Sequence, residues 1–256
     1  MTDNLLFTVE GHVATITLNR PEKLNAATPE MSKAIVAATE ECNRNSDIRC
    51  VIVTGAGPKA FCAGSDISEL DSYATPWDFR NRADYCDAIH HLLKPSIAAV
   101  NGYALGGGLE TALSCDIRIA SANAKFAAPE IKLGWIGGGG MAAQLAHSIG
   151  PSNAAMMIMT GDPIDAETAR AWGLVSDVVA QEALMDRARE LATTIASRAP
   201  IAAETAKLNL RAAFAMPLEK AMEYERDLQT ICFATADAQE GRAAFKEKRP
   251  PVFRRR

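Results

Sequence analysis

The sequence predicts an α/β core followed by a helical C-terminal region. Short apolar runs that suit strands alternate with helical patterns over roughly the first 180 residues, which is typical of strand–helix units built around a sheet. From Glu182 onward the pattern is helical throughout, with breaks near Pro200 and Pro217. The composition fits a globular protein, because 48% of the 256 residues are hydrophobic and 23% are charged.

The N-terminal elements follow from local patterns. Apolar and polar residues alternate over residues 5–10 and 12–18 on either side of Gly11, which predicts a β-hairpin. Thr28 can cap a helix that we expect over residues 29–43, since the proline at its first position suits the first helical turn.

The central part of the chain continues with short strands and helices. Residues 69–93 are polar and aromatic, which predicts a mobile loop followed by a helix that ends before Pro95. We expect strands over 50–54, 96–100, 116–120 and 175–179, and helices over 109–114, 142–149, 152–160 and 165–172.

The composition argues against several classes of function. The net charge of −4 gives no global basic field for nucleic acid. The six cysteines show no CxxC spacing, which favours reduced thiols and a cytoplasmic protein. The four histidines form no ligand cluster, so we expect no metal site. We also expect no signal segment and no membrane span, because no uninterrupted apolar stretch of about 18 residues exists.

The most informative segment is Asn101–Glu110, in which three consecutive glycines, Gly106–Gly108, lead into a helix-like stretch. Glycines let the backbone approach a ligand closely, and a helix N-terminus adds exposed N–H groups and a positive dipole end. Glu110 places a carboxylate one turn away, and Glu130 supplies a second one shortly before the glycine run Gly137–Gly140. Oxyanion donors beside two carboxylates indicate acid–base chemistry next to a carbonyl group.

Each feature of this segment also has a purely structural interpretation. A glycine can simply make a turn, and a glutamate in the first turn of a helix is common because it favours the helix dipole. A Pro-Glu pair such as Pro129-Glu130 is an ordinary helix start. The functional interpretation therefore depends on the combination of Glu110, Glu130 and the glycines.

A second glycine-containing segment follows the predicted strand at 50–54. Residues 55–60 match the dinucleotide fingerprint G-x-G-x-x-A, but Pro58 and the further Gly64 argue against a long helix there. We favour a turn after which Ala63-Gly64-Ser65 presents a backbone N–H group. A plain strand-to-helix turn is the alternative.

Taken in order, a long series of motifs spans nearly the whole chain. The series is Asn19–Pro21, Leu24–Ala26, Ala60–Asp66, Pro95, Ala98–Gly108, Cys115–Asp116, Phe126, Pro129–Glu130, Leu133–Gly134 and Ala171–Val175. It resembles the crotonase superfamily, the enoyl-CoA hydratase/isomerase family. The resemblance implies a crotonase-like spiral of ββα units over residues 1–195 with an acyl-CoA site. It also implies a helical C-terminal oligomerisation region over 196–256, in a homotrimer or a dimer of trimers.

The resemblance also implies roles for individual residues. The backbone N–H groups of Ser65 and Gly107 would bind the thioester oxygen, at a first position where the family often has alanine. The substrate loop near the CoA moiety maps to Lys23, Leu24 and Ala26. Further substrate contacts are expected from Ala63, Asp66, Ile67, Gly138, Trp135 and Met141. Asp66 can also cap a helix that begins near Ile67.

The pair of glutamates indicates the reaction. Family members that hydrate enoyl-CoA resemble this chain in carrying both, and adding water across a conjugated C=C needs water activated at Cβ and a proton delivered at Cα. We expect Glu130 to donate the Cα proton and Glu110 to orient or activate the water. An isomerase, another thioester-enolate enzyme and a non-catalytic acyl-CoA-binding protein are the alternatives. CoA belongs to the substrate, so no metal or redox cofactor is expected.

Two regions affect these expectations. The segment 135–144 departs from the family pattern. Trp135 and Met141 are expected to change the bulk of the acyl pocket. The Gly138 N–H still falls where a backbone donor would hold the water. The basic tail Phe253–Arg256 is either a frayed, solvated terminus or a contact with a ligand phosphate. For Lys248 the two alternatives are similar: a position near the CoA phosphates, or a solvated side chain.

Overall fold

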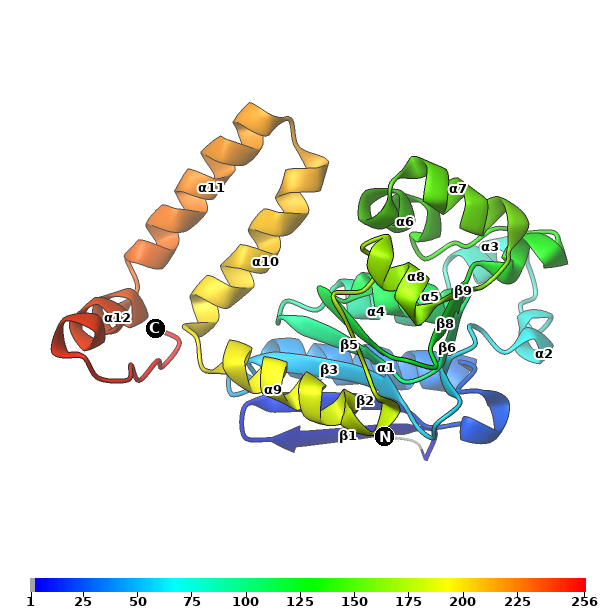
Figure 1. Ribbon diagram of the computed structural model, residues 1–256, viewed down its shortest axis with the longest axis horizontal. Helices are drawn as coiled ribbons and strands as arrows, with labels where there is room; N and C mark the ends of the chain where they lie inside the picture. Colours follow the sequence, from blue (N-terminus) through cyan, green and yellow to red (C-terminus); the bar gives the residue numbers. More distant parts are fainter. Residues whose placement is uncertain (1–2) are drawn as a thin grey trace.

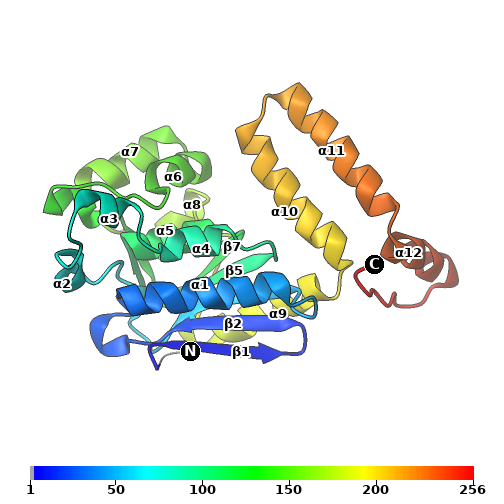
Figure 2. The same cartoon turned by 180° about the vertical axis from the view of Figure 1, so that it is seen from behind.

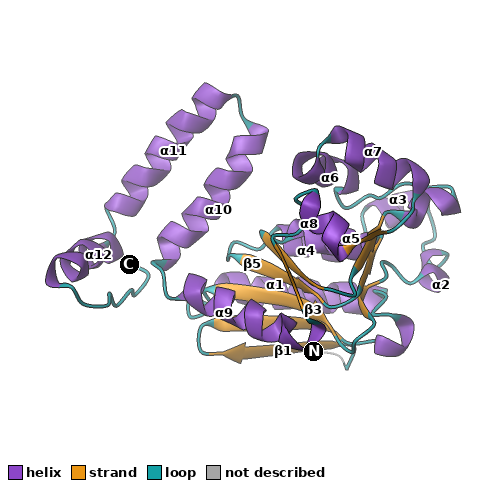
Figure 3. Ribbon diagram, viewed as in Figure 1, coloured by secondary structure: helices purple, strands orange, loops and turns teal. Residues whose placement is uncertain are grey.

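The computed structural model describes residues 3–256 and contains two β-sheets (Figure 3). The large sheet holds β1 (Leu5–Glu10), β2 (Val13–Leu18), β3 (Cys50–Gly55), β5 (Ser96–Val100), β7 (Ile117–Ser121) and β10 (Asp177–Val179), in this order across the sheet. The small sheet holds β4 (Ala60–Cys62), β6 (Tyr103–Leu105), β8 (Lys125–Ala127) and β9 (Ile164–Asp165). β1 and β2 form an antiparallel hairpin, and the other neighbours in the large sheet are parallel.

Helices surround the sheets (Figure 1). Their bounds are α1 Pro29–Arg44, α2 Ile67–Leu70, α3 Pro76–Arg80, α4 Tyr85–His90, α5 Gly107–Ser114, α6 Met141–Ile149, α7 Pro151–Thr160, α8 Ala166–Ala171, α9 Leu184–Ala196, α10 Pro200–Ala215, α11 Leu218–Phe233 and α12 Ala236–Glu247. Short 3₁₀ turns cover 21–23, 129–133 and 181–183. The expected hairpin, the four strands and the helical C-terminal region are confirmed within one or two residues. Thr28 caps α1 as predicted, since its hydroxyl accepts a hydrogen bond from the Met31 N–H at 3.2 Å.

The large sheet is covered on both faces. Its period of two sends Val51 and Val53 of β3 into the cluster that also contains residues of α1, α4 and α5. Cys50 and Ile52 point the other way and pack with Leu184, Ala188 and Ala192 of α9. All of β3 is therefore buried, as expected for a central parallel strand.

The small sheet was not predicted from the sequence. Its strands are two or three residues long, too short to show an alternating pattern. β4, β6 and β8 each follow a strand of the large sheet across a turn, and helices follow them in turn. The result is the expected spiral of ββα units, and it leaves the turns between strands and helices together at one end.

The segment 69–93 holds more helix than expected. The short helix α3 lies within it and was not predicted, whereas α2 begins at Ile67 as expected and α4 ends before Pro95 as predicted. Asp84 caps α4 by accepting hydrogen bonds from the N–H groups of Cys86 and Asp87.

Helices α10, α11 and α12 extend away from the α/β body (Figure 2). The predicted breaks near Pro200 and Pro217 are confirmed, and a third break follows α11, where Thr235 caps α12. α10 is attached to the body by Lys207, which is buried. Its ammonium group pairs with Asp116 at 2.8 Å and donates to the carbonyl oxygen of Lys94 at 2.9 Å.

The basic tail is not a frayed terminus, so that interpretation was wrong. The N–H groups of Arg254 and Arg255 donate to the carboxylate of Asp237 at 2.7 and 2.8 Å. Arg49 donates to the carbonyl oxygen of Phe253 at 3.1 Å. These bonds hold the chain end against α12 and the body, close to the beginning of α10 (Figure 1).

Two further findings concern the described residues as a whole. No helix within residues 3–256 is both long enough and apolar enough to cross a membrane. All six cysteines are free thiols, and five of them are buried.

Candidate active site

Two loops that carry predicted site residues lie side by side. The N–H of Ala63 donates to the carbonyl oxygen of Leu24 at 3.0 Å, and the N–H of Ala27 donates to that of Gly64 at 2.8 Å. Arg20 ties the loops together, because its guanidinium donates to the carbonyl oxygen of Ala26 at 2.7 Å and to the carboxylate of Asp66 at 3.1 Å. The structure therefore brings the expected CoA loop to the segment that contains Ser65.

The other predicted residues of these loops lie at their edge. Lys23 and Ile67 are exposed. Asp66 caps α2 as expected, since its carboxylate accepts a hydrogen bond from the Ser68 N–H at 3.3 Å. The Ser68 hydroxyl, which donates to the Asp66 carboxylate at 2.7 Å, lowers the pKa of Asp66 below its ordinary value, and the Arg20 pair and the capping bond lower it further.

Gly64 places the Ser65 loop directly against the start of α5. Its φ of +93° is a left-handed conformation that favours glycine, and a Cβ there would lie 3.2 Å from the Gly107 nitrogen. The hydrogen bonds that bridge this loop to Ala27 involve Gly64 and Asp66, so the Ser65 N–H points away from them. Within residues 3–256, the N–H groups of Ser65 and Gly107 are not bonded to a protein acceptor. Two backbone donors thus lie in neighbouring segments, as an oxyanion hole requires.

Each of the three glycines at the start of α5 touches a different group. A Cβ on Gly106 would lie 2.7 Å from a carboxylate oxygen of Glu130. A Cβ on Gly107 would overlap the hydroxyl of Tyr85, and one on Gly108 would overlap the carbonyl oxygen of Cys62. Close approach, rather than a turn, therefore explains the glycine triplet.

Glu110 is buried in the first turn of α5, with 5% of its surface exposed. Its Oε1 accepts hydrogen bonds from the N–H groups of Gly139 at 2.7 Å and Met141 at 3.3 Å. Burial, with a smaller contribution from the nearby charge of Glu130, raises the pKa of Glu110 to about 7, although the two backbone donors oppose this rise. A carboxylate with this pKa can take up and release a proton near neutral pH.

Glu130 lies in the 3₁₀ turn 129–133 and faces the same space. Its Oε2 is buried, and nothing within residues 3–256 donates a hydrogen bond to it. Burial raises the pKa of Glu130, so its protonated form is favoured compared with a solvated glutamate. Its Oε2 therefore has a hydrogen-bonding capacity that no described protein group uses.

The glycine run after residue 134 holds Glu110 in place. Gly139 and Met141 provide the two N–H donors, whereas Gly138, where a water contact was expected, is exposed. The side chain of Met141 is only 2% exposed and packs in the core, and its Cβ lies close to Glu110, since a Cβ on Gly137 would be 2.7 Å from both Met141 Cβ and Glu110 Oε1. Trp135 is exposed at the surface of the loop.

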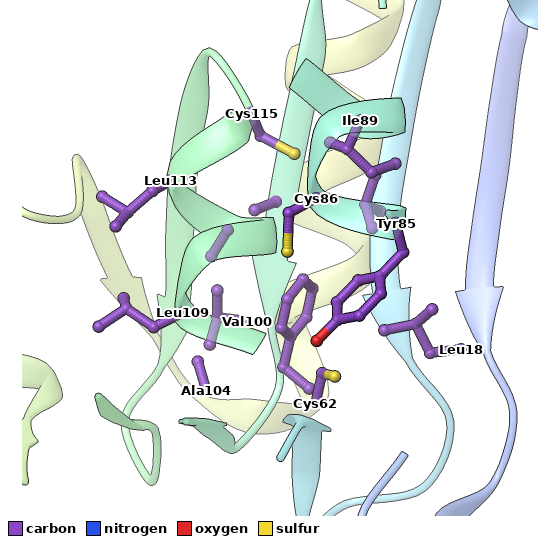
Figure 4. Packing of buried hydrophobic residues seen from close by; sticks show 14 of the residues in the cluster. Leu18, Cys62, Tyr85, Cys86, Ile89, Val100, Ala104, Leu109, Leu113 and Cys115 are labelled. Carbon is purple, nitrogen blue, oxygen red and sulfur yellow. The ribbon is translucent and has the colours of Figure 1, made fainter. Parts of the chain in front are cut away.

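Two residues next to these groups were not identified from the sequence. Tyr85 and Cys86, on the first turn of α4, extend among the buried residues around α5 (Figure 4). The Tyr85 hydroxyl lies 3.2 Å from the Ser65 hydroxyl oxygen, and the Cys86 thiol donates to the Gly107 carbonyl oxygen at 3.3 Å. The sequence signal for α4 is its cap, Asp84, but nothing local says that α4 packs on α5.

No group of three or more metal-binding side chains comes together among residues 3–256. The site consists instead of the buried carboxylate of Glu110, the half-buried carboxylate of Glu130, two backbone N–H groups without a protein acceptor, and glycines that lie against both carboxylates. Fold and site together define an acid–base enzyme that polarises a carbonyl oxygen.

Comparison with known proteins agrees with this class. A model of the enoyl-CoA hydratase/isomerase family matches residues 8–256. The chain therefore belongs to the enoyl-CoA hydratase/isomerase family, and it is an enzyme of the enoyl-CoA hydratase type.

Relatives and solved structures cover almost the full length. The chain is 41% identical to an (E)-benzylidenesuccinyl-CoA hydratase of Thauera aromatica, over 96% of this chain and 97% of the relative. It is 39% identical to a short-chain-enoyl-CoA hydratase of Clostridium acetobutylicum, over 96% of each chain. The crystal structure of an enoyl-CoA hydratase from Bacillus anthracis matches with a TM-score of 0.94 at 35% identity, over 99% of this chain and 100% of that one.

Proposed function

We propose that the chain adds water to a 2-enoyl-CoA thioester and forms a 3-hydroxyacyl-CoA, or catalyses the reverse dehydration, at the site between Glu110 and Glu130. The observation that supports this proposal is the pair of carboxylates with raised pKa, one buried and one half-buried, beside the free N–H groups of Ser65 and Gly107. A carboxylate in a poorly solvated site can act as a base in its ionised form and as an acid in its protonated form.

The four groups divide the chemistry as follows. Ionised Glu110 takes a proton from water while the water oxygen bonds to Cβ and the C=C electrons move toward the thioester oxygen. The N–H groups of Ser65 and Gly107 stabilise the charge on that oxygen. Protonated Glu130 then delivers its proton to Cα. The proton that Glu110 took from water finally passes to Glu130, which restores the starting state of both carboxyl groups.

The substrate contacts follow from the neighbouring loops. The loop of Lys23, Leu24 and Ala26 is bonded to the Ser65 segment, which supports a role for these residues in contacting the CoA moiety. Ala63, Asp66, Ile67 and Trp135 would border the acyl group, and the Gly138 N–H would contact the water. The Thauera aromatica relative is named for an aromatic substrate, so aromatic enoyl-CoAs belong in the test panel. The proposed chemistry needs no metal or redox cofactor.

The helices after residue 196 would form the oligomer. Large apolar side chains are exposed on α10, α11 and α12: Leu210, Phe214, Leu218, Ile231, Phe233 and Phe245. Exposed apolar groups on this scale are typical of an interface. We propose a homotrimer or a dimer of trimers in the cytoplasm. Light scattering should give three or six times the chain mass of 27.4 kDa, and a monomer mass would contradict this.

Loss of the conjugated-thioester absorbance tests the reaction, with crotonyl-CoA and longer and aromatic enoyl-CoAs. We expect turnover that collapses in both Glu110→Gln and Glu130→Gln. The matched control is Glu167→Gln, which changes an exposed glutamate on α8. Loss in only one of the two variants, with formation of a shifted double bond, would favour isomerisation. Binding of CoA esters without turnover of any of them would contradict the enzyme proposal.

A further inference from the structure

The hydroxyl of Tyr85 lies between the two proposed oxyanion donors. It is 3.2 Å from the Ser65 hydroxyl oxygen, and it occupies the position that a side chain on Gly107 would take. Tyr85 is only 3% exposed, so its hydroxyl lies in the protein interior. One side chain from α4 therefore contacts both of the residues whose N–H groups would bind the thioester oxygen.

The two hydroxyls can form only one hydrogen bond with each other, which leaves one of their two O–H groups without a partner. Each oxygen holds one hydrogen, and only one hydrogen can lie between the two oxygens. Within residues 3–256, neither hydroxyl has another hydrogen-bond partner. Whichever way the pair is oriented, one O–H group has no protein acceptor.

Ser65 is half-buried, whereas Tyr85 is buried, so the orientation in which Ser65 donates to Tyr85 leaves a buried O–H group without an acceptor, at a general cost of about 1–3 kcal/mol. If Tyr85 only filled space, a phenylalanine ring would do so without a polar group. If Ser65 only supplied its backbone N–H, an alanine would serve equally well. In that orientation the phenol O–H needs an acceptor, and the group expected beside the Ser65 and Gly107 N–H groups is the thioester oxygen.

We infer that the Tyr85–Ser65 hydroxyl pair supplies a third hydrogen bond to the thioester oxygen, in addition to the two backbone N–H groups. This inference rests on the proposed function. Ser65 donates to the Tyr85 oxygen, and the more acidic phenol donates to the substrate oxygen. The bond strengthens as negative charge develops there, so it acts mainly on the chemical step and little on binding.

The first test compares the kinetics of Tyr85→Phe, Ser65→Ala and wild type with crotonyl-CoA. We expect kcat to fall roughly 10- to 100-fold in Tyr85→Phe, with KM changed less than about threefold. Ser65→Ala should lower kcat in the same direction, and the double variant should lose less than the product of the two effects, because the hydroxyls act as a pair. The matched control is Tyr224→Phe on α11, which should leave kcat unchanged.

The second test separates a hydrogen bond from a structural role. In a Glu130→Gln background, which prevents turnover, the carbonyl stretching frequency of bound isotope-labelled crotonyl-CoA reports polarisation of the C=O bond. Adding Tyr85→Phe or Ser65→Ala should move this frequency toward its value in solution. A fall in kcat with an unchanged frequency would overturn the inference, as would a kcat within about twofold of wild type in both variants. Failure of the wild type to hydrate any enoyl-CoA would instead contradict the proposed function.

Discussion

The carboxylate of Glu110 accepts a hydrogen bond from the backbone N–H of Gly139 at 2.7 Å. This bond joins the first turn of α5 to a glycine run that lies 29 positions further along the chain. A Cβ on Gly139 would lie 2.8 Å from the Cβ of Cys86 and 2.9 Å from Oε2 of Glu110. The run therefore approaches Glu110 as closely as it does only because it lacks side chains.

We first predict that Gly139→Ala lowers kcat for hydration about 10- to 100-fold, because the new methyl group displaces the Glu110 carboxylate by a fraction of an ångström or more. Steady-state kinetics with crotonyl-CoA measure this effect. The control is Gly241→Ala on α12, where the new methyl group would meet only the Phe253 ring at an ordinary 3.6 Å. Equal activity of the two variants would show that the position of Glu110 does not depend on Gly139.

The second prediction concerns the pH dependence of the rate. Hydration needs ionised Glu110, whose pKa is raised to about 7, so kcat/KM should fall about tenfold per pH unit well below 7. Dehydration runs through the same groups in reverse, and the equilibrium constant of hydration does not depend on pH, so kcat/KM for dehydration should fall in parallel below about pH 7. A kcat/KM for hydration that stays constant from about pH 7 down to about pH 5 would contradict the requirement for ionised Glu110.

The third prediction concerns stability. The pKa of Glu110 in the folded protein lies above its ordinary value, so the folded state binds more protons than the unfolded state. This contribution to stability is fully present below about pH 4.5 and is lost as the pH rises through about 7, on the order of 3 kcal/mol in total. Glu110→Gln should therefore be more stable than wild type at pH 8 and should lose this pH dependence. Urea unfolding at pH 5 and pH 8 measures both, with Glu167→Gln as the control. A wild-type advantage at pH 8 would contradict the sign.

The fourth prediction concerns the attachment of α10. Lys207→Met breaks the pair between the buried Lys207 ammonium group and the more exposed Asp116, and we expect a cost near the lower end of the roughly 3–5 kcal/mol for fully buried pairs. The matched control is Lys220→Met, which breaks an exposed pair with Glu223 and should cost at most about 1 kcal/mol. Chemical denaturation measures both free energies of unfolding. Similar values for the two variants would show that the Lys207 network does not stabilise the docked helix.

Local patterns were sufficient for much of the fold. The hairpin around Gly11, the cap at Thr28 and the strand at β3 depend on residues close together in the sequence, and each was predicted within one or two residues. The small sheet was missed because strands of two or three residues have no period to recognise. The tail was misjudged because the acceptor of its N–H groups, Asp237, lies on α12.

The sequence by itself determined which groups could form a site: two glutamates, a glycine triplet and a serine after a strand. Only the tertiary structure decided how they act. It buries Glu110 and raises its pKa, brings the N–H of Gly139 to it, and places Tyr85 against Ser65 and Gly107. The physical reason is that propensity and capping act over a few residues, whereas burial and these contacts depend on where distant segments return to the core.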